Sequence, residues 1–157
     1  MFLLGNKPLE QLAEDDLQKL VDTEIESRYI DYKEKIYAPP PDAQLPLEQS
    51  ERKRVKDRWK IELCNDVSSF ANAAGGWIIC GVLEDGGIAT DVCGLGTNID
   101  IEQEIARLEG AIFSGIEPSI PGLQFQSVTL QDAQKGNVLL IRVPRSYRAP
   151  HRVKETQ

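Results

Sequence analysis

The chain has 157 residues, 41% hydrophobic and 27% charged, a balance typical of one folded domain rather than of a disordered segment. Its longest apolar run, Trp77–Val82, is far shorter than the roughly 20 residues that a membrane-spanning helix needs, so we expect no membrane partner. The opening Met1–Leu4 is apolar but short and follows no cationic region, unlike a signal peptide. The three cysteines are odd in number and widely spaced, which predicts reduced thiols and a cytoplasmic protein.

Charge is unevenly distributed around the formal net value of −7. Residues 51–60 hold six bases and two acids, and residues 136–157 hold five bases and one acid. The remainder of the chain is acidic. Two basic segments on an acidic body are typical of a face that binds a polyanion, provided that the two meet in space.

The first half of the chain predicts helix, strand and helix. Leucine and valine spacings predict a short helix over residues 8–21. Alternation predicts a strand over 28–37, which the proline run 39–41 ends. Apolar residues three or four apart predict the longest helix, over 50–74, which Gly75–Gly76 stops.

The second half predicts mainly strands. The run Trp77–Val82 reads as a central strand, followed by an acidic turn and a return strand within 88–95. The later elements are, in order, a helix from 101 capped by Asp100 and broken by Pro118 and Pro121, strands over 123–130 and 138–143, and an irregular tail over 144–157.

This order predicts an α+β fold, with a mixed or antiparallel sheet of about five strands packed with three helices. We expect one domain over residues 1–157, with residues 38–60 as an inserted proline-rich and basic segment. A homodimer and a further C-terminal domain are additional partners to be considered.

Asp31 and Lys33 are two residues apart on a predicted strand and so share a face, and Glu26 lies five residues before Asp31. Carboxylates beside a lysine suit metal-dependent phosphodiester cleavage, because carboxylates hold a divalent cation and the lysine contacts the phosphate. The alternative interpretation is a solvated strand edge or a surface ion pair. Glu84 and Asp85 form a second acidic pair, at a turn after a strand, where an ordinary hairpin turn is the alternative.

Basic residues of the long helix and of the tail are the candidate nucleic-acid contacts, because they can neutralise phosphates. They are Arg52, Lys53, Arg54, Lys56, Arg58 and Lys60 in the helix, and Arg142, Arg145, Arg148, His151 and Arg152 in the tail. A solvated helix face and a frayed tail are the alternatives. The single histidine is no sign of acid–base catalysis.

Three motifs together resemble the Schlafen AlbA-type domain family. Glu26–Lys33 reads E-S-x-x-x-D-Y-K, Ser69–Val82 reads S-F-A-N-A-A-G-G-W-I-I-C-G-V, and Val143–His151 reads V-P-x-S-x-x-x-P-H. The resemblance covers about residues 9–153. Asp31 is one methylene shorter than the glutamate usual at this position of the family.

The resemblance implies that three carboxylates form a metal-dependent endoribonuclease site. They correspond to Glu26, Asp31 and Glu84, with Asp85 as a rival for the third, and would bind Mg²⁺ or Mn²⁺. Lys33 would contact the scissile phosphate, and the RNA substrate would be structured, such as tRNA. The alternatives are a non-catalytic DNA- or RNA-binding regulatory module and a domain that binds only proteins.

Overall fold

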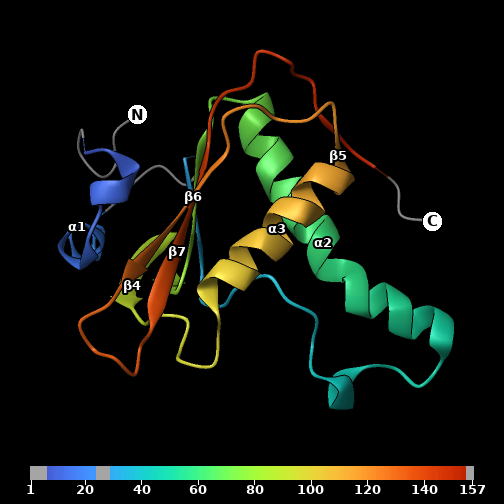
Figure 1. Ribbon diagram of the computed structural model, residues 1–157, viewed down its shortest axis with the longest axis horizontal. Coiled ribbons are helices and arrows are strands. Elements are labelled where there is room, and N and C mark those ends of the chain that lie inside the picture. Colours follow the sequence, from blue (N-terminus) through green and yellow to red (C-terminus); the bar gives the residue numbers. More distant parts are fainter. Residues whose placement is uncertain (1–6, 24–28, 155–157) are drawn as a thin grey trace.

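The computed structural model describes residues 7–23 and 29–154, which are arranged in three layers around a central sheet (Figure 1). The sheet has the strand order β1-β2-β7-β6. Its strands are β1 (Ile30–Lys33), β2 (Gly76–Cys80), β7 (Asn137–Val143) and β6 (Gln124–Thr129). Strand β1 pairs with β2 in parallel, whereas β2, β7 and β6 are antiparallel, so the sheet is mixed and β1 forms one edge.

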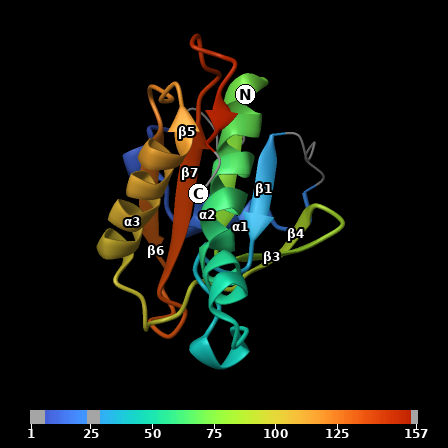
Figure 2. The ribbon, with the colours of Figure 1, turned by 90° about the vertical axis from the view of Figure 1, so that its right-hand side faces the viewer.

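The two faces of the sheet are covered by different elements. Helices α2 (Gln49–Asn72) and α3 (Ile101–Gly115) lie on one face (Figures 1 and 2). The short helix α1 (Glu14–Gln18) and the hairpin of β3 (Val82–Asp85) and β4 (Ile88–Val92) lie on the other. Two small strands, β5 (Ile116–Glu117) and β8 (Arg152–Val153), pair separately. The predicted α+β class with a mixed sheet and three α-helices is therefore confirmed.

Neighbouring side chains of each central strand enter two separate apolar cores. Ile79 and Leu140 pack toward α1 and the hairpin, whereas Ile78 and Ile141 pack toward α2 and α3. All four are fully buried, and each such side chain contributes about 1.5–3 kcal/mol of transfer free energy. Burial on both faces explains why these strands read as continuous apolar runs rather than alternating ones.

Helix α2 confirms the longest predicted helix almost residue for residue. Trp59, Leu63, Val67 and Ala71 are buried at four-residue spacing, so one stripe of the helix packs on the sheet. Its basic N-terminal half extends beyond the sheet (Figure 1). The later helix is confirmed as well, since the Asp100 carboxylate accepts a hydrogen bond from the Gln103 amide at the start of α3.

The first predicted helix, over 8–21, is much shorter in the structure and is interrupted. A 3₁₀ turn, Leu9–Gln11, is followed by an extended Leu12 and then by the five residues of α1. The Asp16 carboxylate accepts a hydrogen bond from the Ala13 amide, which starts the helix anew. Leucine spacing here reflects contact with the apolar core rather than helical periodicity.

The predicted strands 28–37 and Trp77–Val82 are each shorter than expected. The first is ordered as a strand only over β1, and Tyr37 turns back to a buried position against α2. The second breaks at Gly81, whose φ of +107° bends the chain between β2 and β3. The return strand 88–95 forms as β4 and pairs with β3, outside the central sheet.

The tail is more ordered than predicted. Its residues Arg152–Val153 form β8, and His151 is only 5% exposed. Both ring nitrogens of His151 are engaged, Nδ1 with the Pro118 carbonyl oxygen at 2.6 Å and Nε2 with the Ser146 hydroxyl at 2.6 Å. Because the carbonyl can only accept, Nδ1 donates to it, and the contacts of both nitrogens hold the ring in place beneath the loop.

Candidate functional site

Lys33 lies at the centre of an acidic cluster between β1 and α2. Its ammonium is 3.1 Å from a Glu62 carboxylate oxygen and 3.5 Å from carboxylate oxygens of both Asp31 and Asp66. The Tyr37 hydroxyl donates to Asp66 at 2.6 Å. The sequence analysis predicted Asp31 and Lys33 but missed Glu62 and Asp66. These two residues add negative charge from the α2 side of the cluster.

The cluster changes the acidity of its members. Burial raises the pKa of Asp31, and the Asp66 charge raises it further, while Lys33 opposes both. Burial alone would lower the pKa of Lys33, but the hydrogen bond that its ammonium donates to Glu62 and the three carboxylate charges outweigh burial and raise that pKa overall. Lys33 is therefore held as a cation, and the raised pKa means that Asp31 gains a proton more readily than an ordinary aspartate.

A pocket of about 300 Å³ opens beside this cluster at the free edge of β1. Polar groups from three elements line it: Asp31 from β1, Asp66 and Ser69 from α2, and Glu84 from β3. Tyr32 also lines it, and its buried hydroxyl has no hydrogen-bond partner among the described residues. We call this the acidic pocket.

Glu84 and Asp85, the two candidates for the third carboxylate, differ in their position relative to the acidic pocket. Glu84 lines it, and one Glu84 oxygen accepts a hydrogen bond from the Gly87 amide at 2.7 Å, which fixes the side chain over its own turn. Asp85 is exposed and is not among the lining residues. Glu26 lies outside the described residues, so its predicted place in the site is untested.

Carboxylate oxygens are suitable ligands for Mg²⁺ or Mn²⁺. Within residues 7–23 and 29–154, however, no three acidic, histidine or cysteine side chains are grouped closely enough to hold a metal ion. The Lys33 ammonium, near Asp31 and Asp66, supplies positive charge at the same place. A metal site here would need Glu26 and a rearrangement of the Lys33 ion pairs.

A second hollow, of about 340 Å³, lies at the end of β2 and β7 and has the opposite charge. Arginine and aromatic side chains line it, with no acid among them. Apart from alanine and glycine, the residues that line it are Tyr29, Trp77, Arg142, Val143, Pro144, Arg145 and Tyr147. We call this the arginine groove.

The arginines of this groove are available to an anion. The Arg142 guanidinium lies 5.9 Å from the Trp77 ring centre and 3.4 Å from the Gln124 side-chain oxygen. Neither Arg142 nor Arg145 forms an ion pair with an acid in the described part of the chain. Both are exposed, so their charge reaches solvent.

The acidic pocket and the arginine groove share a wall. Tyr29 lines the groove and the next residue, Ile30, lines the pocket. Phe70 lines the pocket, and its ring lies so close to Gly76 of the groove that a β-carbon there would meet it at 2.3 Å. The fold thus brings acids from β1, α2 and β3 next to arginines from β7 and the tail.

The start of the basic half of α2 lies away from the acidic pocket and the arginine groove. From Arg54 to the C-terminal end of α2 at Asn72, the helix rises about 27 Å, at about 1.5 Å per residue. Arg52 pairs with Asp42, and Lys60 lies 3.7 Å from Asp57. Among the described residues of the tail, Lys154 lines a hollow together with Lys60 of α2. Of the other tail candidates, Arg148 is exposed and Arg152 pairs with Glu117.

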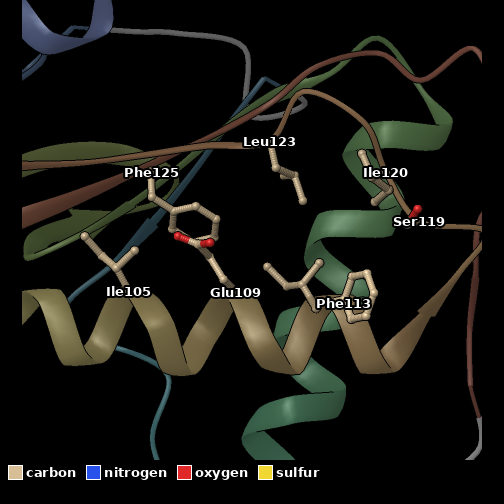
Figure 3. A pocket seen from close by; sticks show the side chains of 8 residues that line it. Ile105, Glu109, Phe113, Ser119, Ile120, Leu123 and Phe125 are labelled. Carbon is tan, nitrogen blue, oxygen red and sulfur yellow. The ribbon is translucent and has the colours of Figure 1, made fainter.

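A third hollow lies between α3 and the segment that leads into β6 (Figure 3). Ile105, Glu109 and Phe113 of α3 face Ile120 and Phe125 across it. Phe113 is 76% exposed. No residue that the sequence predicted for the site lines this hollow, so it takes no part in the candidate site.

An α+β domain with an acidic pocket beside an arginine groove is the class of protein that this geometry defines. The family described as Schlafen, AlbA_2 matches residues 26–157, and the chain belongs to this family. Membership indicates a function connected with nucleic acid. No helix in the described residues is both long and apolar enough to cross a membrane.

Among solved structures, the chain is similar to the DIP2311 protein from Corynebacterium diphtheriae. The identity is 18% and the TM-score is 0.43, over 83% of this chain and 22% of that one. The chain therefore spans about a fifth of the length of this relative. No curated protein matches the chain.

Proposed function

We propose that the chain is a nucleic-acid-binding domain and that its acidic pocket cleaves structured RNA, such as tRNA, with the help of Mg²⁺ or Mn²⁺. The observation that carries the proposal is the shared wall between the acidic pocket and the arginine groove. A phosphodiester strand held by Arg142 and Arg145 would pass directly beside Asp31 and Glu84.

The residues have distinct roles in this proposal. Glu26, Asp31 and Glu84 would hold the metal ion, which when bound activates water and offsets phosphate charge. Lys33, held as a cation by its carboxylate neighbours, would be drawn toward the phosphate once the strand occupies the pocket.

The test uses end-labelled tRNA with the purified chain, with and without Mn²⁺. We expect metal-dependent cuts that are lost in Glu26→Gln and Glu84→Gln. Glu84 is exposed and contacts only its own turn, so Glu84→Gln keeps the fold. Glu109→Gln, on α3 and away from both sites, is the matched control and should cut normally. Cuts that persist in Glu84→Gln would contradict the assignment of the pocket.

A non-catalytic DNA- or RNA-binding module is the second candidate. It is favoured by the ion pairs of Lys33 with Asp31 and Asp66, because a cation of the protein itself already balances part of the negative charge that a metal ion would need. Salt-sensitive binding without any metal-dependent cut would support this candidate. A gel shift at low salt that shows no binding to any nucleic acid would instead support a domain that binds only proteins.

A further inference from the structure

We infer that the arginine groove binds an unpaired nucleotide, so that the domain prefers single-stranded nucleic acid over a blunt duplex. The inference rests on the proposed nucleic-acid function and specifies the form of ligand that the groove takes. In it, Arg142 and Arg145 bind phosphates, and Trp77 and Tyr147 stack on a base.

The aromatic residues are the first step of the argument. Tyr147 is 100% exposed on the tail loop, and no packing role in the described structure accounts for a fully exposed tyrosine. Trp77 is only partly buried and lies beside it in the same groove. Flat aromatic faces next to arginines are the usual means of holding single strands, because every unstacked base offers a π-face.

The charge pattern is the second step. The groove combines two arginines without carboxylate partners and a lining that contains no acid, on a protein whose net charge is −7. An acidic body repels a polyanion except where cations gather, which localises the strand at the groove. Guanidinium groups bind phosphate oxygens in pairs, so each arginine can hold one phosphate.

The shape of the backbone is the third step. Gly75 has a φ of +80°, and a β-carbon on it would lie 2.7 Å from the Val143 oxygen and 2.8 Å from the Arg145 nitrogen. The floor of the groove is therefore bare backbone packed on backbone. Ser146 donates its amide to the Ala71 carbonyl at 3.0 Å, so the loop that carries Arg145 and Tyr147 is anchored between them.

A duplex would not reach the same contacts. Its bases are stacked on one another, so neither Trp77 nor Tyr147 can insert without breaking base pairs, which costs a few kcal/mol per step. Single strands offer their bases at no such cost. The preference for unpaired nucleotides follows from the position of aromatic rings among the phosphate contacts rather than from any base-specific hydrogen bond.

The test compares a labelled ten-nucleotide single-stranded RNA with the blunt duplex of the same sequence, by fluorescence anisotropy at several salt concentrations. We expect the single strand to bind at least about tenfold more tightly. Tyr147→Ala should weaken single-strand binding about 5- to 150-fold, the range for loss of one stacked base, and leave its salt dependence unchanged. Arg142→Gln should instead lower the slope of log affinity against log salt by about 0.7.

Two controls and a direct readout accompany these variants. Phe113→Ala removes an exposed aromatic ring outside the groove, and Lys19→Gln removes an exposed cation outside it; both should bind normally. The chain has two tryptophans, so in a Trp59→Phe background the emission reports Trp77 alone. Quenching of that emission by single-stranded RNA is expected if a base stacks on the ring.

The outcomes separate the inference from the function on which it rests. Equal affinity for strand and duplex, with no effect of Tyr147→Ala but weaker binding by Arg142→Gln, overturns the inference and leaves nucleic-acid binding intact. Absence of binding to either RNA at low salt overturns the binding function itself. Single-strand preference with a loss in Tyr147→Ala supports both.

Discussion

The side chain of Asn72 pairs with both backbone groups of His151, 79 residues further along the chain. Its Oδ1 accepts from the His151 amide at 2.7 Å, and its Nδ2 donates to the His151 carbonyl at 3.0 Å. A carboxamide is the one uncharged side chain group that offers a donor and an acceptor side by side. The end of α2 and the tail are therefore joined in a fixed register, through one residue of the F-A-N motif and one of the P-H motif.

Asn72→Ala should destabilise the chain by about 1–3 kcal/mol, because two hydrogen bonds are lost and the backbone groups of His151 are left unpaired. Urea unfolding followed by circular dichroism measures the change. Asn65→Ala is the control, since Asn65 is exposed on the same helix and its side chain has no hydrogen bond within the described residues. If Asn65→Ala lowered the free energy of unfolding as much as Asn72→Ala, the pairing with His151 would not be the cause of the destabilisation.

Lys33→Met should destabilise the chain at neutral pH, because Asp31, Glu62 and Asp66 would then face one another without a cation. The expected cost is on the order of 1–3 kcal/mol, between the values for exposed and buried ion pairs. The double variant Lys33→Met, Glu62→Gln should recover part of the loss, as measured by chemical unfolding. Lys35→Met, an exposed neighbour, should change stability little; equal effects would argue against the ion-pair cluster.

The raised pKa of Asp31 predicts a dependence of stability on pH. A carboxyl whose folded-state pKa is raised binds a proton more readily in the folded than in the unfolded chain. Its stabilising contribution is complete below the ordinary value of 3.8 and is lost as pH rises through the folded-state pKa. The free energy of unfolding of the wild type minus that of Asp31→Asn should therefore fall between pH 3 and neutrality. Urea titrations at intervals across that range test it, and a difference that rises with pH would refute the assignment.

Gly75→Ala should cost much more stability than Gly86→Ala. Both glycines have positive φ, +80° and +59°, so each substitution carries a backbone cost of about 1–2 kcal/mol. Only at Gly75 would the new β-carbon meet backbone atoms, whereas nothing lies within 4 Å of the one at Gly86. Thermal unfolding of the two variants measures the difference. Melting temperatures lowered by the same amount would mean that the backbone near Val143 yields without cost.

The arginine groove and the basic half of α2 should contribute differently to the binding of short and long RNA. Arg142→Gln with Arg145→Gln should weaken binding of both a short single strand and tRNA, because the groove receives either. Lys53→Gln with Lys56→Gln should weaken tRNA alone, since that part of α2 extends beyond the sheet. Anisotropy titrations against both ligands decide the matter. A loss of short-strand binding in the lysine variant would place the strand along the helix instead.

Local patterns predicted the parts of the fold that local contacts determine. Four-residue spacing of Trp59 and Leu63 marks the buried stripe of α2, and the apolar residues of β2 and β7 mark strands buried on both faces. The sequence predicts Gly81 as part of one continuous strand, because nothing local shows that its φ is positive. The sharp change of direction there depends on how the hairpin packs against β1.

The candidate site was predictable only where its residues lie in a motif or just after one. Asp31 and Glu84 were found this way, and the structure places both in the acidic pocket. Glu62 and Asp66 were missed because two acids four residues apart on a helix read as a solvated face. Only the approach of β1, which is distant in sequence, turns that face into part of the site. His151 was read as an exposed tail residue for the same reason.

The residues of the tail loop are of two kinds, buried anchors and exposed side chains. Ser146 and His151 are buried and bind the loop to α2 and to Pro118, while Arg145, Tyr147 and Arg148 are exposed. Anchoring side chains and solvent-facing side chains thus occupy different positions of one short segment. Evolution, or an engineer, can exchange the outward side chains to change what the loop contacts without disturbing the anchors that shape it.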